Sequence, residues 1–291
     1  MLRNYFVVAF RSLKRHRLQS LTTILGLALS MAVCLLIITL VYDQKQYDAF
    51  HERADRIHRV YVDFKSAINR DKHLYAMSPA ALPGMLEADV PGVERAVRIR
   101  ARAGGLFSGA GGAQGVQVEG LYADPAFFDV FSFPLAGGDA RTALAEPNTV
   151  VLSADAAVRL FGDADPIGRV VTRGEGEEAV DFTVTGVLAP LPGRTHLPVD
   201  AVASLATVTA DSSFLASQDN WAAQIYGWYT YFVLEEGASA SRVEAALPRL
   251  VERHFAPRDE NVLHALHLQG LRDINLGPVL DNQLGFVLPG F

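Results

Sequence analysis

Hydrophobic positions are continuous from Leu21 to Tyr42, a stretch that contains no charged residue. A helix rises about 1.5 Å per residue, so this stretch can cross a hydrocarbon layer of about 30 Å. Every charged residue before it is basic, and the first acidic residue, Asp43, follows it directly. This asymmetry is the positive-inside pattern, and it predicts a transmembrane helix over 18–44 with a cytoplasmic N-terminus. A cleaved signal peptide fits less well, because its apolar core is about 7–15 residues and ends at a small-residue site.

The residues before the span are both apolar and basic. Leu2, Phe6, Phe10 and Leu13 recur at helical spacing, while arginine and lysine residues lie on other faces. Residues 1–17 are therefore predicted to form an amphipathic helix at the cytoplasmic interface, in contact with the lipid bilayer. A juxtamembrane tail without fixed structure is the alternative, because the pattern is short.

Beyond the span, short alternating segments predict strands, and turn residues separate them. The strand patterns cover 60–64, 97–101, 116–121, 149–152, 169–172, 180–184 and 229–233. Helices are predicted to start at Ser78-Pro79, to cover 126–131, to run from the N-cap Ser153 to Gly162, and to cover 243–254 with an interruption at Pro248. Residues 43–54 are expected to extend the membrane helix as a stalk. The mixture predicts an α+β fold.

Charge and cysteine content limit the function classes. The chain carries 26 basic and 32 acidic residues, and its basic residues are concentrated before the span. The part after Tyr42 is therefore strongly acidic, which argues against nucleic acid as a partner, since nucleic-acid binding neutralises phosphates. Cys34 is the single cysteine and lies within the span, so no disulfide can form within the chain.

Two features suggest ligand chemistry but lack the residues that complete a site. The glycine-rich segment 104–115 is not followed by the Lys-Ser or Lys-Thr pair of a phosphate-binding P-loop, so it predicts a loop or hairpin tip. His264 and His267 are the only closely spaced histidines, and no nearby cysteine or acid completes a zinc site. We therefore expect no metal and no cofactor.

The remaining candidates have simpler structural interpretations. Ser153 lacks the Gly-x-Ser-x-Gly elbow and is predicted to cap a helix. The acidic residues Glu175, Glu177 and Glu178 fit a solvated turn. Three alternating arginines could bind an anion or form a solvated sheet face; they are Arg98, Arg100 and Arg102. Three aromatic residues could form a contact surface or belong to the core; they are Trp221, Tyr226 and Trp228. No catalytic set results, so the chain is not predicted to be an enzyme.

Several motifs occur in an order that resembles a known family. They are Tyr47–His51, Ala54–Ile57, Tyr122–Pro125, Phe127–Phe131, Leu135–Asp139, Glu146–Ser153, Leu160–Asp163, Asp165–Gly168 and Phe182–Leu188. Together with the basic segment and the span, they resemble the N-terminal part of ABC transporter permeases of the MacB/FtsX type. The resemblance covers nearly the whole chain.

The resemblance implies a MacB-like periplasmic core domain over 45–285. This domain would be a two-lobed mixed α/β unit, with one lobe inserted into the other at roughly 125–235. It also implies a cytoplasmic ABC ATPase as partner, a permease homo- or heterodimer, and in some relatives a periplasmic adaptor. In that family ATP binding moves the membrane helices, and these move the periplasmic lobes to export or release substrate. The expected location is the inner membrane.

The sequence departs from the family at its C-terminal end. Family members have at least three further spans after the periplasmic domain, whereas residues 286–291 contain no second apolar run of spanning length. Asn275 also stands where histidine is common in the family. We therefore expect a truncated permease fragment. The alternative is a single-pass, membrane-anchored periplasmic sensor or adaptor that binds a ligand or partner.

Overall fold

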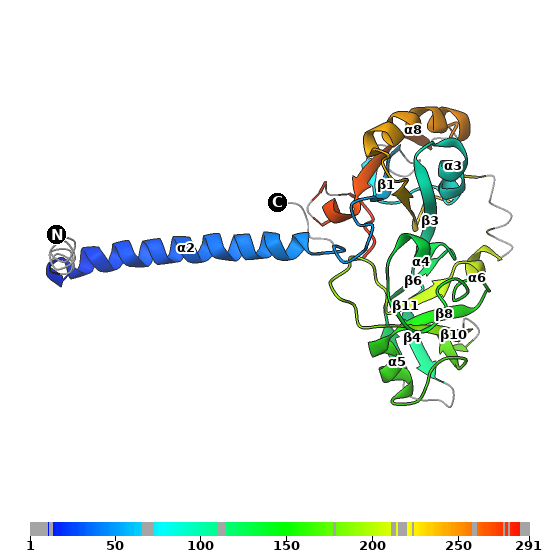
Figure 1. The fold of residues 1–291 in the computed structure, drawn as a ribbon, viewed down its shortest axis with the longest axis horizontal. Coiled ribbons are helices and arrows are strands. Elements are labelled where there is room, and N and C mark those ends of the chain that lie inside the picture. Colours follow the sequence, from blue (N-terminus) through cyan, green and yellow to red (C-terminus); the bar gives the residue numbers. More distant parts are fainter. Residues whose placement is uncertain are drawn as a thin grey trace. The chain divides into compact units, whose positions relative to one another are not determined.

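The computed structural model describes residues 11, 14–65, 73–109, 115–176, 179–210, 214, 220–222, 224–257, 261–275, 277–278 and 280–285. The chain forms two compact units, residues 1–45 and 46–291. In the first unit, α2 (Arg17–Lys45) is one continuous helix that is long and apolar enough to cross a membrane (Figure 1). Its large apolar side chains are exposed, as lipid contact requires. The helix predicted over 1–17 lies largely outside the described residues.

Among the described residues of the second unit, thirteen strands form one sheet. Their order is β13-β1-β12-β3-β6-β11-β8-β10-β9-β4-β5, with β2 paired to β1 and β7 paired to β10. The β8–β10 and β6–β11 pairs are parallel, and the other pairs are antiparallel. The strands are β1 (Ile57–Lys65), β2 (His73–Tyr75), β3 (Val93–Ala101), β4 (Gly105–Gly109), β5 (Val116–Val118), β6 (Gly120–Ala123), β7 (Leu135–Gly138), β8 (Thr149–Ser153), β9 (Val170–Arg173), β10 (Val180–Leu188), β11 (Ala201–Ser204), β12 (Trp228–Leu234) and β13 (Val262–Gly270).

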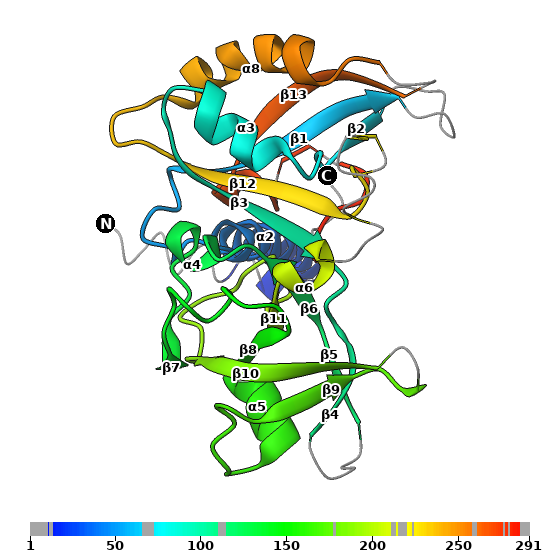
Figure 2. The same cartoon turned by 90° about the vertical axis from the view of Figure 1, so that its right-hand side faces the viewer.

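Helices pack at both ends of this sheet. They are α3 (Leu82–Asp89), α4 (Phe127–Val130), α5 (Ala154–Phe161), α6 (Ala206–Thr209) and α8 (Ala240–His254), with a 3₁₀ turn at Leu271–Asp273. Figure 2 shows α3 and α8 beside β1, β3, β12 and β13 at one end, and α5 beside β8, β9 and β10 at the other. Helix α8 buries Val243, Leu247 and Leu250 at helical spacing.

The buried side chains form two hydrophobic clusters. One contains residues of α3, α4, α8 and the strands β1, β3, β12 and β13, and the other contains residues of α5 and the strands β4, β8, β9 and β10. Strand β6 contributes Leu121 and Ala123 to the first cluster and Tyr122 to the second. Strands β8 and β11 also contribute to both clusters, and since successive side chains of a strand point to opposite faces, the two clusters lie on opposite faces of this part of the sheet. The sheet is thus continuous while its core is divided.

The expected stalk over 43–54 is wrong. Helix α2 ends at Lys45, and the following residues form turns within the second unit. Asp48 has a left-handed backbone conformation, with a φ of 57°, and its side chain is buried. A polar segment without glycine or proline looks helical in sequence, but here buried hydrogen bonds to distant residues compensate for the loss of helix.

Two other local predictions need correction. Ser78 does not cap a helix; its buried hydroxyl donates a hydrogen bond to Thr230 Oγ1 at 2.8 Å, and α3 begins later, at Leu82. Pro248 does not interrupt α8, which is continuous through it. At Ser78, a partner remote in sequence outweighs the local preference for a helix cap.

The strand order also bears on the inserted lobe expected at roughly 125–235. Strands β4 and β5 precede residue 125 but pair with β9 and each other at the far end of the sheet. Strand β12 lies before residue 235 but pairs between β1 and β3. We propose that the inserted lobe spans about 103–209, because this range keeps β4, β5 and β7–β11 with their paired neighbours and leaves only the pairing of β6 with β3 across its boundary.

Candidate functional site

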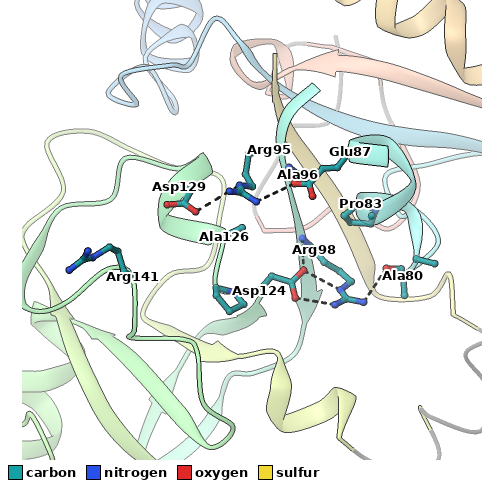
Figure 3. Close-up of a pocket in the computed structure, with 13 residues that line it drawn as sticks. Ala80, Pro83, Glu87, Arg95, Ala96, Arg98, Asp124, Ala126, Asp129 and Arg141 are labelled. Atoms are coloured by element: carbon teal, nitrogen blue, oxygen red, sulfur yellow. Dashed lines mark hydrogen bonds and ion pairs between the residues drawn. The ribbon is translucent and has the colours of Figure 1, made fainter. Parts of the chain in front are cut away.

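A cavity of about 540 Å³ lies between α3, β3 and α4. Figure 3 shows two arginines of β3 directed into it. Arg98 binds the carboxylate of Asp124 with two nitrogens, at 3.1 and 3.2 Å. Arg95 lies between Glu87 and Asp129, with N–O distances of 3.8 and 4.0 Å. Each arginine therefore faces an acid.

Pairing of charges gives this cavity a structural role. Glu87 also accepts a hydrogen bond from the backbone nitrogen of Ala96 at 2.7 Å, and Arg98 donates to the carbonyl of Ala80 at 3.4 Å. Arg141 at the rim pairs with Asp139 at 3.3 Å. These ion pairs and hydrogen bonds connect α3, β3 and α4. Because the charges that line the cavity neutralise one another, the cavity offers no unpaired charge to a ligand.

The histidine pair considered as a metal site does not come together. His264 and His267 lie three positions apart on β13, so their side chains point to opposite faces of the strand. His267 instead stacks on Tyr61, with ring centroids 5.0 Å apart. No group of three or more potential metal ligands occurs within the described part of the chain.

The other residues singled out in the sequence have varied positions. Ser153 caps α5 as predicted, accepting a hydrogen bond from the backbone nitrogen of Ala156 at 3.1 Å. Glu175 is exposed in the turn after β9, and Glu177 and Glu178 lie outside the described residues. The aromatic group is divided: Trp221 and Trp228 are buried in different clusters, and Tyr226 is 47% exposed.

A buried polar network lies just after α2, and sequence analysis missed it. Its members are Asp48, His51, Arg59, His196 and Tyr231, which we call the polar joint. Asp48 Oδ2 is 2.7 Å from His196 Nδ1, and His196 Nε2 is 2.8 Å from the Tyr231 hydroxyl. His51 Nε2 is 3.8 Å from the other Asp48 oxygen. The side chains of Asp48, His196 and Tyr231 are at most 1% exposed, so no substrate can reach them.

The polar joint connects segments that are distant in the chain. Asp48 follows the end of α2 by three residues, and its backbone nitrogen donates to the carbonyl of Arg194 at 2.8 Å. Thr195 donates its hydroxyl to Asp48 at 2.6 Å. On the opposite side, Arg59 of β1 donates to the side-chain oxygens of Gln269 and Gln283 at 2.5 and 2.6 Å. The joint thus fixes the first residues after α2 to β1, β12 and β13.

The electrostatics of the joint favour a charged carboxylate. Burial alone raises the pKa of Asp48, but the charge of His196 and hydrogen bonds from His196 and Thr195 outweigh it, with His51 also nearby, so the pKa lies well below its usual range. Burial raises the pKa of Tyr231 well above its ordinary value, although Arg59 opposes this. Tyr231 therefore remains a neutral hydrogen-bonding group between His196 and Arg59.

The motif Tyr47–His51 held the signal for this network, because it places an aspartate and a histidine immediately after the span. Its partners could not be identified from the sequence. His196 is an isolated histidine in a loop, and Tyr231 belongs to a strand in which every side chain is buried.

Comparison with known families and structures complements this geometry. The family model for the MacB-like periplasmic core domain matches residues 20–250. The chain belongs to this family. The match begins within α2 and ends within α8, so it includes most of the apolar helix as well as the sheet. No curated protein sequence gives a significant match.

One solved structure shows the same fold, and a second gives a weaker match. A domain of a proposed permease protein from Porphyromonas gingivalis is similar with a TM-score of 0.63 and 21% identity, over 76% of this chain and 91% of that one. The periplasmic region of MacB from Actinobacillus actinomycetemcomitans gives a TM-score of 0.48 and 13% identity, over 73% and 89%. The chain is thus a mixed α/β member of an ABC-type transporter permease family, and its apolar helix fits a membrane-anchored protein.

Proposed function

We propose that the chain is part of the permease subunit of an ABC transporter of the MacB/FtsX type. A separate cytoplasmic ATPase would hydrolyse ATP, and the membrane helices would transmit the resulting movement to the periplasmic domain for export or substrate release. The family match carries this proposal, because it extends without a break from the apolar helix through the folded domain. A second permease chain, identical or different, would complete the membrane unit, and a periplasmic adaptor would receive substrate.

The polar joint supports a mechanical role. It fixes the residues after α2 to three strands through buried hydrogen bonds. Buried hydrogen-bonded charges hold one geometry and are costly to separate. The first residues of the sheet domain would therefore move together with its strands. In this proposal the chain moves a substrate and does not change it chemically.

The proposed topology places the N-terminus in the cytoplasm and the sheet domain in the periplasm of an inner membrane. All charges before Leu21 are basic, which supports this direction. Fusions after Phe64 to alkaline phosphatase, which is active only in the periplasm, and to green fluorescent protein would test it. We expect phosphatase activity without fluorescence, and the reverse pattern would contradict the orientation.

Co-purification tests the transporter assignment itself. The full chain, expressed in its native host with an affinity tag, should co-purify with an ABC ATPase that mass spectrometry identifies. Replacing five basic residues before the span by glutamine provides a control with altered topology. Stable accumulation of the chain without any ATPase would instead favour a single-pass sensor or adaptor.

A further inference from the structure

A second cavity of about 540 Å³ has a different charge from the one near Arg98. Its described lining includes three arginines and three tyrosines, and none of its described lining residues is acidic. These are Arg100, Arg102, Arg173, Tyr122, Tyr226 and Tyr229. Such a concentration of positive charge stands out in a chain with a net charge of −6.

The register of the sheet creates this concentration. Arg100 of β3 lies opposite Trp228 of β12 on one side and opposite Tyr122 of β6 on the other. Residues directly opposite in neighbouring strands share a face, so these three side chains form a row. Tyr122 in turn accepts a hydrogen bond from Arg173 of β9. Strands from both hydrophobic clusters therefore meet at this cavity.

Arg100 and Arg173 contact aromatic rings, and Arg173 also contacts a main-chain carbonyl; among the described residues no carboxylate pairs with either. The guanidinium of Arg100 lies 5.1 Å from the centre of the Trp228 ring. Arg173 lies 5.6 Å from the Tyr122 ring centre and donates to the carbonyl of Arg102 at 3.4 Å. A cation–π contact uses the face of a guanidinium and leaves N–H groups at its edge. Within the described residues, Arg100 and Arg102 have no acidic partner, unlike Arg98.

The backbone at Arg102 indicates that this arrangement has a cost. Its φ of 74° is left-handed, a conformation that favours glycine, and glycine residues follow at 104 and 105. Strained positions of this kind tend to occur at functional sites. The amide nitrogen Nε2 of Gln283, which also lines the cavity, is buried and has no hydrogen-bond partner in the described structure. It adds one more unused donor.

The tyrosines experience the same positive field. Burial raises the pKa of Tyr122, while Arg173 and Arg100 oppose that rise. Burial likewise raises the pKa of Tyr229, and Arg59 and Arg102 oppose it. Both hydroxyls stay neutral. The hydroxyl of Tyr229 already donates to the carbonyl of Asn282 at 3.0 Å, whereas that of Tyr122 accepts from Arg173 and keeps its own proton for an oxyanion.

We propose that this cavity binds a small molecule through a carboxylate or phosphate group. Arg100 and Arg102 would bind the oxyanion with their free N–H edges, Arg173 would supply further charge, and the tyrosines would contact the rest of the molecule. Paired N–H groups of arginine match the oxygens of carboxylate and phosphate. The volume is within the usual range of small-molecule sites.

Isothermal titration calorimetry of the full chain in neutral detergent micelles would test the proposal. The probes are citrate and inorganic phosphate at low ionic strength. We expect wild-type protein to bind at least one of them, with Arg100→Gln and Arg102→Gly each weakening binding by about tenfold or more. Arg249→Gln is the matched control, because Arg249 is exposed on α8 and outside this cavity. It should bind as the wild type does.

The variant Arg102→Gly separates binding from folding. Glycine suits a φ of 74°, so the melting temperature should be unchanged or higher while affinity falls. Repeating the titration in nanodiscs distinguishes a lipid headgroup from free phosphate as the ligand. If the affinity for free phosphate is lower in phosphatidylglycerol nanodiscs than in phosphatidylcholine nanodiscs, the lipid headgroup competes for the site. Absence of binding to both probes, or equal binding by wild type and Arg102→Gly, would overturn the proposal. The assay needs no ATPase, so its result is independent of the proposed function.

Discussion

Replacing His196 by alanine tests whether the polar joint holds the domain together. The substitution removes the group 2.7 Å from Asp48 Oδ2 and 2.8 Å from the Tyr231 hydroxyl. Thr195 and a backbone nitrogen remain beside Asp48, but the balancing charge is lost. The carboxylate then stays buried, since its side chain is only 1% exposed.

The expected loss of stability is large. Removing one partner of a buried ion pair costs about 3–5 kcal/mol, because the other charge is left uncompensated. In a domain of this size each kcal/mol lowers the melting temperature by about 2–4 °C, so the total decrease is roughly 6–20 °C. Thermal unfolding of the full chain in detergent, followed by tryptophan fluorescence, measures it. Trp221 and Trp228 both lie in the sheet domain, so the signal reports that unit.

Two variants complete this experiment. His264→Ala removes an exposed histidine of the same domain and should change stability by about 0.5 kcal/mol or less. Adding Asp48→Asn to the His196→Ala protein removes the stranded charge, and asparagine tolerates the φ of 57°. The double variant should therefore be more stable than His196→Ala alone. A decrease of only one or two degrees for His196→Ala, or a double variant with strictly additive losses, would refute the reasoning.

Three further predictions concern pH and local packing. The pKa of Asp48 is lower in the folded state than its unfolded value of about 3.9. The ionised carboxylate therefore stabilises the fold fully above that value, and this contribution declines as the pH falls. Melting temperatures should consequently fall less between pH 5 and 3 for Asp48→Asn than for the wild type. Gly120→Ala should destabilise the domain, because a Cβ there would lie 2.5 Å from the carbonyl oxygen of Ala201. In α3, the Cβ of Gly84→Ala would meet nothing within 4 Å, so this variant should stabilise the domain by about 0.5–1 kcal/mol, as measured by urea titration. Ser153→Ala removes the cap of α5 and should cost about 1 kcal/mol by the same measurement.

Local patterns predicted much of this fold. Alternation located β10 and β12, and the cap Ser153 and the left-handed Gly162, with a φ of 63°, bound α5 as expected. These features depend on neighbours in sequence, such as strand periodicity and helix-end hydrogen bonds. They could therefore be identified without knowing which strands pair.

The polar joint and the order of the strands in the sheet could not be predicted in this way. Asp48 leaves the helical conformation because Thr195 and His196, far along the chain, satisfy it. Likewise, β4 and β12 occupy places in the sheet that only long-range pairing decides. Helical propensity of 43–54 was real but weaker than these contacts, since propensity differences amount to a few tenths of a kcal/mol per residue.

The arginines that alternate along β3 have different partners in the fold. Alternation correctly placed Arg98 and Arg100 on the outward positions of a half-buried strand, and it left open whether they bind an anion. The neighbouring strands distinguish the two arginines: Arg98 pairs with Asp124, whereas Arg100 lies over the ring of Trp228 and has no acidic partner among the described residues. One arginine is therefore neutralised and its neighbour keeps its charge. This difference arises from partners more than twenty residues away in the chain. The proposed binding by Arg100 and not by Arg98 therefore depends on how the strands pair, which the sequence of a single strand does not reveal.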